Sequence, residues 1–141
     1  MLSLCSMCLS LYSQKRIPCA PLEEFLNFPE VMSGLQLDSR SDTIVLIDLD
    51  NDFAANCYML RWKNKVAVLK HDPALTKEIR GMDPYKKYKK NCSFYIISEY
   101  SRKGRIHSFE ILRPCNNIQV VGKITLVKGK VKLMEAKWYV L

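Results

Sequence analysis

Three aspartates with the spacing Asp48-x-Asp50-x-Asp52 are the strongest catalytic-looking group in the chain. They lie at the end of the stretch 43–49, TIVLIDL, which is β-branched and apolar, as in a buried strand. Carboxylates in this position can bind Mg²⁺ through their oxygens, so the motif indicates possible metal-dependent chemistry. The alternative interpretation is an ordinary polar turn after a strand.

A second group of residues is basic and aromatic. The stretch 85–90 interleaves two tyrosines with four lysines, and more Tyr, Arg and Lys residues follow. Because cations contact phosphates and aromatic rings stack on bases, this pattern predicts a surface for single-stranded DNA or RNA. The alternative is that Tyr95 or Phe94 fills the core and that the lysines only form a solvated, protected edge. The predicted nucleic-acid-binding residues are Tyr85, Lys86, Lys87, Tyr88, Lys89, Lys90, Tyr95, Tyr100, Arg102, Lys103, Arg105, Lys123, Lys128, Lys130 and Lys132.

The charge of this 141-residue chain is unevenly distributed. Its net charge is +8. Residues 1–52 hold three basic and eight acidic residues, a balance of −5, and residues 53–141 hold 19 basic and six acidic residues, a balance of +13. Such asymmetry favours a polyanionic partner for the basic part. The alternative is that the charge only keeps the protein soluble.

The N-terminal segment bears on the cellular location. Its first dozen residues are apolar, with Lys15 and Arg16 after the run rather than before it. This is the wrong polarity for a secretory signal, and the run is too short to span a bilayer. We therefore expect the nucleus or cytoplasm, a reducing compartment with free thiols, and no membrane span. The 85–90 lysines also resemble a basic nuclear-localisation patch.

The six cysteines do not form a convincing metal site. They are Cys5, Cys8, Cys19, Cys57, Cys92 and Cys115. The chain has only two histidines, His71 and His107, both far from the Cys5-x-x-Cys8 pair, so no metal or cofactor is expected. A three-cysteine zinc site and palmitoylation of Cys5 and Cys8 are the alternatives.

The elements that would position these residues are mostly strands. Residues 20–32 predict a short amphipathic helix stopped by Pro29, and residues 33–42 read as a polar linker. We therefore expect a leader over 1–40 and a basic β domain over 41–141. A helix is also expected over 72–79, with Asp72 as its N-cap. The predicted hairpins join 57–62 to 66–70, 93–100 to 105–112, and 118–127 to 130–141.

Apolar pairing determines the register of the last hairpin. A two-residue turn at Lys128-Gly129 sets apolar residues opposite one another near the turn. The apolar phase breaks after Leu133, and one extra residue near Met134–Glu135 restores it, which is a β-bulge. The predicted pairs are Leu126–Val131, Ile124–Leu133, Val120–Trp138 and Ile118–Val140. Since bulges accompany strong bending, the expected fold is mainly β, a small antiparallel barrel with one or two short helices.

The segment 118–141, IQVVGKITLVKGKVKLMEAKWYVL, combines a strand glycine, Gly122, with a short basic turn. It resembles the last hairpin of OB-fold domains, most of all those in small subunits of replication protein A and of telomere-capping complexes. The segment 93–112 fits the second and third strands of the same fold. The resemblance implies an OB-like barrel that binds single-stranded nucleic acid, as a subunit of a larger complex.

Two other functions stay open. One is a protein–protein scaffold or a viral matrix-like β protein, with contacts through Trp138, Tyr139 and the 22–28 helix. The other follows from the aspartate motif, which resembles the first motif of haloacid-dehalogenase-type phosphatases and the opening strand of PIN-like nucleases. That resemblance implies a Mg²⁺-dependent hydrolase using Asp48, Asp50 and Asp52, and it requires a parallel sheet with Asp48 at a strand's carboxyl end. We expect a protein that is not an enzyme, because successive hairpins follow the motif without further paired acids.

Overall fold

The computed structural model describes residues 19–37, 43–81, 83, 86 and 89–141. These residues form one seven-stranded sheet, three α-helices and a short 3-10 turn. The strands are β1 (Thr43–Asp48), β2 (Met59–Trp62), β3 (Lys65–Lys70), β4 (Phe94–Lys103), β5 (Ile106–Arg113), β6 (Ile118–Val127) and β7 (Lys130–Val140). The helices are α2 (Ala20–Leu26), α3 (Pro29–Leu35) and α4 (Pro73–Gly81), and the turn is η2 (Pro114–Asn116).

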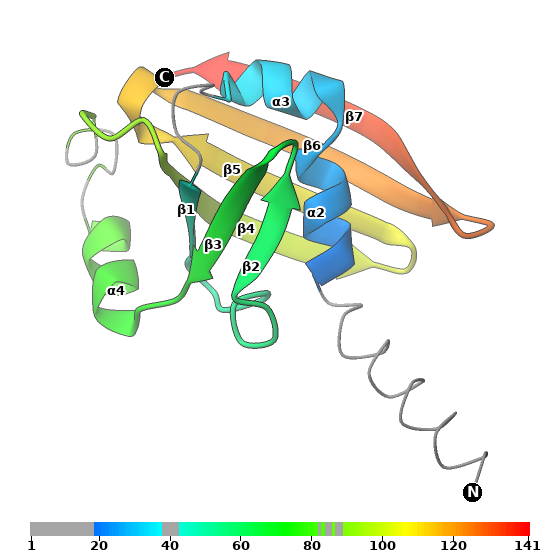
Figure 1. The fold of residues 1–141 in the computed structure, drawn as a ribbon, viewed down its shortest axis with the longest axis horizontal. Helices are drawn as coiled ribbons and strands as arrows, with labels where there is room; N and C mark the ends of the chain where they lie inside the picture. Colours follow the sequence, from blue (N-terminus) through cyan, green and yellow to red (C-terminus); the bar gives the residue numbers. More distant parts are fainter. Residues whose placement is uncertain (1–18, 38–42, 82, 84–85, 87–88) are drawn as a thin grey trace, which may run out of the picture.

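The sheet is mixed and open, with the strand order β2-β3-β1-β4-β5-β6-β7. Strand β1 is parallel to both of its neighbours, and all other neighbours are antiparallel. The sheet curls strongly around α2 and α3, as Figure 1 shows. The expected mainly β class is confirmed, but the closed OB-like barrel is wrong. The sheet stays open because its edge strands β2 and β7 do not pair with each other in the described residues; α2 contacts β2, and α3 contacts β6 and β7.

The two N-terminal helices belong to the core of the domain. Their apolar side chains lie against the concave face of the sheet and are completely buried: Leu22, Phe25, Leu26, Val31 and Leu35. Side-chain bonds from Asn27 to Arg61 O (2.9 Å) and from Lys63 N to Asn27 Oδ1 (2.6 Å) join the end of α2 to the β2–β3 hairpin. Residues of α2 and α3 thus share one core with the sheet, while the expected division at residue 41 stays a prediction.

Pro29 has a different role from the one predicted. Helix α2 does end before it, at Leu26, but Pro29 then begins α3, which runs to Leu35 and so includes the first residues of the predicted 33–42 linker. Proline suits the first turn of a helix because its fixed φ is already helical and the missing N–H has no helical partner there.

Helix α4 covers the other face of the sheet beside β1. Its buried Ile79 belongs to a second, smaller apolar cluster with Ile47 and Ile96. The predicted N-cap is confirmed, since Asp72 Oδ1 accepts a hydrogen bond from Ala74 N at 3.0 Å. In the described part of the chain, this face of β5, β6 and β7 carries no helix (Figure 1).

All three predicted hairpins are present, and the last one has the predicted register. Val127 pairs with Lys130, and both turn residues, Lys128 and Gly129, have left-handed φ values of 50° and 75°, as a primed hairpin turn requires. The register shifts between Lys123 and Ile124, which leaves Met134 as the extra residue of the predicted bulge. The confirmed pairs are Leu126–Val131, Ile124–Leu133, Val120–Trp138 and Ile118–Val140.

Two disulfides join elements that are distant in sequence. Cys19, before α2, bonds Cys57, before β2, and Cys92, before β4, bonds Cys115 in η2. The expectation of free thiols is therefore wrong for these four cysteines. Disulfides form and persist in oxidising compartments, so the pairing argues against the reducing compartment we expected. The cellular location itself stays a prediction.

The helices of the described ranges contain no segment long and apolar enough to cross a membrane.

Candidate functional site

Six of the predicted cations gather at the turns of two adjacent hairpins. Because β5 pairs with β6, the β4–β5 turn and the β6–β7 turn lie at the same end of the sheet (Figure 1). Leu126 N, near one turn, donates a hydrogen bond to Arg105 O in the other at 3.3 Å. The six side chains are all exposed, and we call them the hairpin-tip cations: Arg102, Lys103, Arg105, Lys128, Lys130 and Lys132.

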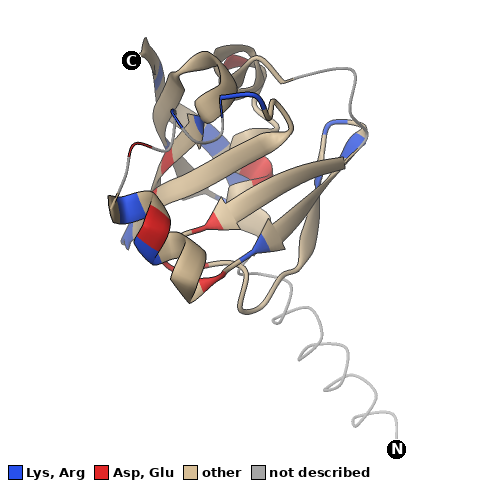
Figure 2. Cartoon of the chain, turned by 90° about the vertical axis from the view of Figure 1, so that its left-hand side faces the viewer, with Lys and Arg blue, Asp and Glu red and all other residues tan. Residues whose placement is uncertain are grey.

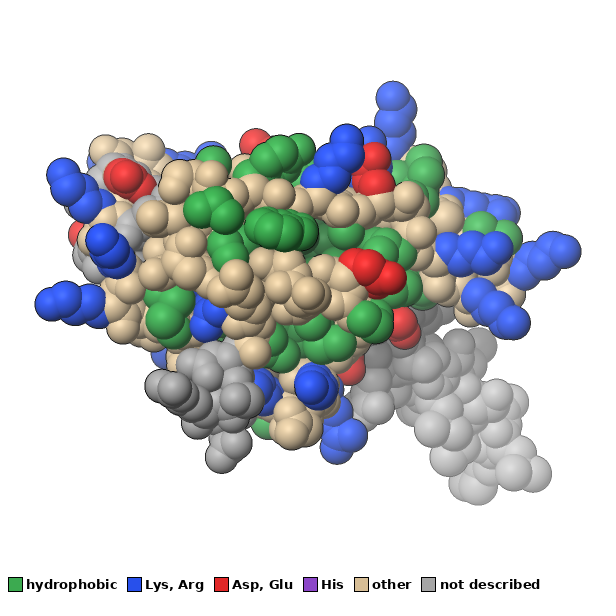
Figure 3. Space-filling model, turned by 90° about the horizontal axis from the view of Figure 1, so that it is seen from above, with side chains coloured by type: hydrophobic (Ala, Val, Ile, Leu, Met, Phe, Trp, Pro, Cys, Tyr) green, Lys and Arg blue, Asp and Glu red, His purple; other side chains and the backbone are tan. Residues whose placement is uncertain are grey.

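Among the described residues, no acidic side chain forms an ion pair with a hairpin-tip cation. Within the described ranges, the ion pairs are Arg80–Asp50 and Lys123–Glu135, and neither includes a hairpin-tip cation. Figure 3 shows Lys and Arg side chains gathered at the right-hand end, where the β6–β7 turn lies. At the opposite end, α4 carries acidic and basic residues side by side (Figure 2). A group of unpaired like charges creates a positive potential that attracts a polyanion.

The width of the hairpin tips suits several phosphate groups. Neighbouring strands are about 4.8 Å apart, so the four strands β4 to β7 span about 14 Å. This width exceeds the separation between neighbouring phosphates of one nucleic-acid strand. The arrangement can therefore contact consecutive phosphates of one nucleic-acid strand.

The lysines of the 85–90 stretch lie at the other end of β4. Lys86, Lys89 and Lys90 are exposed and precede β4, whereas the hairpin-tip cations Arg102 and Lys103 are its last two residues and the other four come after it. Ten residues of strand separate the two ends by about 33 Å. The predicted single basic face is thus divided into two groups. The predicted residues Tyr85, Lys87 and Tyr88 lie outside the described residues.

Lys123 belongs to neither group. It is half-buried in the middle of β6, and its Nζ lies 4.0 Å from Glu135 Oε1 on β7. This pairing reduces its availability to an anion.

Two of the tyrosines predicted to contact nucleic acid, Tyr95 and Tyr100, pack against other aromatic side chains. Tyr95 is completely buried and packs edge to face against Trp62, with ring centroids 4.8 Å apart. Tyr100 is half-buried beside Phe53 and Phe109, with centroid distances of 4.6 and 5.1 Å. The prediction that either ring stacks on a base does not fit these positions. Side chains alternate between the two faces of a regular strand, so an odd-numbered and an even-numbered residue would face opposite sides. The register shift between Ile97 and Glu99 reverses this alternation, and for that reason both tyrosine rings face inward.

His107 is a buried polar residue at the same end of the sheet. Its side chain lies on the concave side, 2% exposed, and its Nδ1 is 2.7 Å from the hydroxyl of Tyr100. Burial lowers the pKa of His107, and the nearby positive charge of Arg102 lowers it further. Burial also raises the pKa of Tyr100. Both side chains are therefore neutral at physiological pH.

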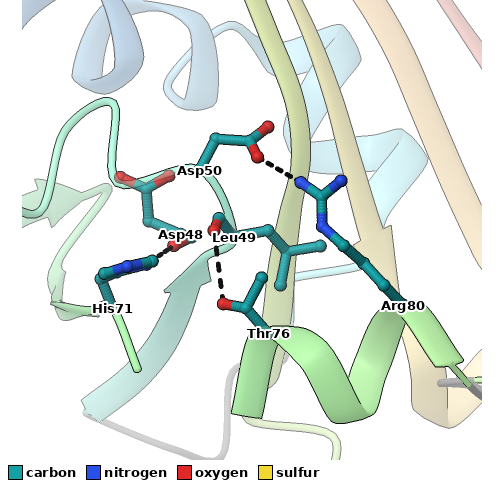
Figure 4. Close-up of polar contacts among 6 residues, drawn as sticks. All are labelled: Asp48, Leu49, Asp50, His71, Thr76 and Arg80. Atoms are coloured by element: carbon teal, nitrogen blue, oxygen red, sulfur yellow. Dashed lines mark hydrogen bonds and ion pairs between the residues drawn. The ribbon is translucent and has the colours of Figure 1, made fainter. Parts of the chain in front are cut away.

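The aspartate motif has the topology that a hydrolase would require. Asp48 is the last residue of β1, which runs parallel to β3 and β4. Figure 4 shows how this end is held: His71 Nδ1 donates to Asp48 O at 2.8 Å, and Thr76 Oγ1 donates to Leu49 O at 3.3 Å. In the same view, Arg80 pairs with Asp50. These contacts join the end of β1 to α4 and to the residue that follows β3.

The Asp48 carboxylate itself stabilises the turn. It is completely buried, and its Oδ2 accepts hydrogen bonds from Phe53 N at 2.7 Å and Ala54 N at 2.9 Å. Burial, together with repulsion from Asp48 and Asp50, raises the pKa of Asp52. The described residues include no group of three His, Cys, Asp or Glu side chains arranged to hold a metal ion. The observed contacts support the turn interpretation of this motif.

Arg113 is a structural residue that the sequence analysis missed. It is 4% exposed, and its guanidinium donates to Leu35 O at 3.2 Å, to Gln36 O, and to Cys92 O at 3.1 Å. It therefore satisfies carbonyls at the end of α3 and holds that helix to the sheet. No local sequence pattern identifies it, because its partners are far away in the chain.

The edge strand β7 exposes apolar side chains. Trp138 is 57% exposed and Tyr139 is 47% exposed, while Met134 and Val140 are also exposed. These residues are accessible to solvent, and the expected partner contact through Trp138 and Tyr139 stays a prediction. The predicted contact through the 22–28 helix does not fit the structure, because the apolar side chains of α2 are inside the core.

We compared the chain with protein-family models, with curated proteins and with solved structures, and found no match in any of the three.

Proposed function

We propose that this protein binds single-stranded DNA or RNA through the hairpin-tip cations, as a non-enzymatic component of a larger assembly. The observation that supports this most directly is the grouping of six exposed cations without an acidic partner among the described residues. The two hairpins that carry them are joined by continuous backbone pairing, so the cations are held on a rigid support.

The proposed binding mode is mainly electrostatic. In the described residues, the predicted tyrosines Tyr95 and Tyr100 pack inward, so the contact rests on phosphates and not on stacked bases. Binding of this kind is weakly dependent on sequence and weakens steeply with salt.

Fluorescence anisotropy with labelled 20-nucleotide DNA and RNA, measured over a NaCl series, tests the proposal. The triple variant Arg105→Glu, Lys128→Glu and Lys130→Glu reverses three of the hairpin-tip cations. The slope of log affinity against log salt changes by about 0.7 per phosphate contact, so we expect the variant to lose a slope of about 2.

A matched control has the same charge change elsewhere. Lys63, Lys70 and Lys77 are exposed and lie away from the hairpin tips, so their triple change to Glu should weaken binding much less. Equal loss in both triple variants would show only a general charge effect. Absence of oligonucleotide binding by the unaltered protein at low salt would disprove the proposed function.

The exposed edge of β7 supports a second candidate function, a docking surface for a partner protein. An edge strand presents unpaired N–H and C=O groups that an added strand can pair with. Strand β7 combines exposed apolar residues with three lysines and one glutamate, so a complementary partner is an extended segment rich in apolar and acidic residues. Replacing Trp138 by Glu should abolish capture of such a peptide without changing oligonucleotide affinity, and an unchanged peptide affinity would reject this candidate.

A further inference from the structure

The sheet has a convex face, which lies on the side opposite α2 and α3, and in the described part of the chain no helix covers it over β6 and β7 (Figure 1). Buried and half-buried residues alternate along β6 between Ile118 and Thr125. The buried ones belong to the core that includes α2 and α3, so the half-buried ones project from the convex face. These half-buried residues are Gln119, Val121, Lys123 and Thr125.

Strand β7 follows the same alternation through its pairing with β6. Residues directly opposite each other in an antiparallel pair project from the same face of the sheet. Trp138 is opposite the buried Val120 and lies on the concave side, where a Cβ atom added at Gly34 of α3 would be 3.3 Å from its Cδ1. The β7 residues opposite the four convex β6 residues are Lys132, Glu135, Lys137 and Tyr139.

The convex face of β7 therefore extends the positive charge of the hairpin tips toward an exposed aromatic ring. Lys132 is itself a hairpin-tip cation, Lys137 follows it along the strand, and both are exposed. The Oε1 atom of Glu135, between them, lies 4.0 Å from Lys123 Nζ, and this pairing offsets its charge. Tyr139 is 47% exposed and ends the row. Its partner on β6 is six residues from the partner of Lys132, a separation of about 20 Å along the strand.

A row of cations that leads to an exposed aromatic ring fits a single nucleic-acid strand. Cations contact its phosphates, and its bases, which have no pairing partner, can stack on an aromatic side chain. In a duplex the bases are stacked on one another inside the helix, out of reach of a side chain on a flat surface. Among the described residues, the other exposed aromatic side chains are Tyr58, beside the opposite edge strand β2, and Trp138, on the concave side.

We propose that a nucleic-acid strand bound at the hairpin tips continues along the convex face of β7, with a phosphate on Lys137 and a base stacked on Tyr139. The inference rests on the proposed function and deepens it, because it adds a base contact to the phosphate contacts of the hairpin tips. It also makes the site selective for single strands over duplexes.

The Tyr139→Leu variant tests the stacking contact. Its binding to a labelled 20-nucleotide single strand and to the corresponding duplex is measured by fluorescence anisotropy over a NaCl series. We expect the variant to bind the single strand about tenfold more weakly at every salt concentration, because the ring on which a base stacks is lost. The slope of log affinity against log salt should stay unchanged, since no phosphate contact is removed. The affinity for the duplex should also stay unchanged.

Three further variants complete the test. Tyr139→Phe keeps the ring and should retain the affinity of the unaltered protein, which separates stacking from a hydrogen bond of the hydroxyl. Tyr58→Leu makes the same change at a tyrosine that is 73% exposed beside β2, and it should bind the single strand as the unaltered protein does. Lys137→Gln should lower the salt slope by about 0.7, which corresponds to one phosphate contact.

Several results would overturn the inference. They are an unchanged affinity of Tyr139→Leu for the single strand, an equal loss in Tyr58→Leu or for the duplex, and an unchanged salt slope in Lys137→Gln. If Tyr139→Leu weakens capture of an apolar, acidic peptide but not oligonucleotide binding, the convex face of β7 contacts a protein partner and the inference is wrong.

Failure of the proposed function has a different signature, because the unaltered protein then binds no oligonucleotide at low salt. If the triple variant of the hairpin tips loses its salt slope while Tyr139→Leu binds normally, the proposed function is supported and only the stacking contact is refuted.

Discussion

Gly122 is the position where the packing permits the most specific prediction. A Cβ atom added at Gly122 would lie 2.6 Å from Phe25 Cε2 and 2.9 Å from the backbone oxygen of Glu135. Neither neighbour can move easily. Phe25 is completely buried and stacked on Phe109 with ring centroids 4.4 Å apart, and Glu135 is a member of the β6–β7 ladder. The Gly122→Ala variant must therefore displace either the aromatic stack or the edge strand.

The expected cost follows from two opposing effects. Overpacking of a core by one methyl group costs about 1–3 kcal/mol, and contact below van der Waals distance on two sides favours the upper end. Replacing Gly by Ala also restricts the unfolded chain, which offsets about 0.4–1 kcal/mol. We expect the free energy of unfolding to fall by about 2 kcal/mol, which corresponds to a decrease in Tm of about 6 °C at this chain length.

Urea denaturation followed by tryptophan fluorescence measures the difference. Gly81→Ala is the matched control, because no atom lies within 4 Å of its added Cβ and the residue ends α4. The control should change stability by less than about 1 kcal/mol. In a Phe25→Leu background, the cost of Gly122→Ala should shrink, because the ring that it meets is gone. If the Gly122 and Gly81 variants are equally stable, the packing argument is wrong.

Three further predictions concern pH, the aspartate turn and the disulfides. Because the pKa of His107 is lowered in the folded state, the unfolded chain binds the proton first, so the free energy of unfolding should fall as pH decreases below about 6.5. In the His107→Phe variant, Tm measured between about pH 5 and 8 should depend less on pH. If Tm depends on pH as strongly as in the unaltered protein, other groups cause the effect. Asp48→Asn should lower the free energy of unfolding, measured by urea denaturation, by about 1–3 kcal/mol, because it weakens two hydrogen bonds to backbone N–H groups. The same change at the exposed Asp50 should lower it by less than about 1 kcal/mol. Equal losses in the two variants would contradict the role of Asp48 in the turn. Reduction of the disulfides should lower the free energy of unfolding by about 2–5 kcal/mol, and unchanged denaturation after complete reduction, checked by mass spectrometry, would count against their role.

Local patterns predicted the hairpins well. The turn Lys128-Gly129 and the alternation of apolar residues on its two sides were enough to determine the register, including the bulge at Met134. Each of these features involves residues that are close in sequence, so the information needed to predict them is contained in one short segment.

Long-range arrangement was less accessible from the sequence. The position of β1 between β3 and β4 depends on pairing with segments on both sides of α4, and nothing in the apolar stretch 43–49 specifies parallel neighbours. The inward direction of Tyr100 depends on a bulge in β4, and the pairing of Cys19 with Cys57 depends on where α2 packs. The distribution of charge was predicted in part. The sequence predicted that cations cluster at the hairpin turns, but it did not predict that the 85–90 lysines lie at the opposite end of β4 from them.

The central position of β1 has a consequence for the order in which the sheet can assemble during synthesis. Strands β4 to β7 are joined by short turns and can pair as soon as they leave the ribosome. Strand β1 is made before both of its neighbours. Val45, for example, can pair only after Val68 has been made on one side and Phe94 on the other. This strongly apolar strand therefore has both edges unpaired until β3 is made, and its second edge can be paired only when more than half of the chain has been synthesised.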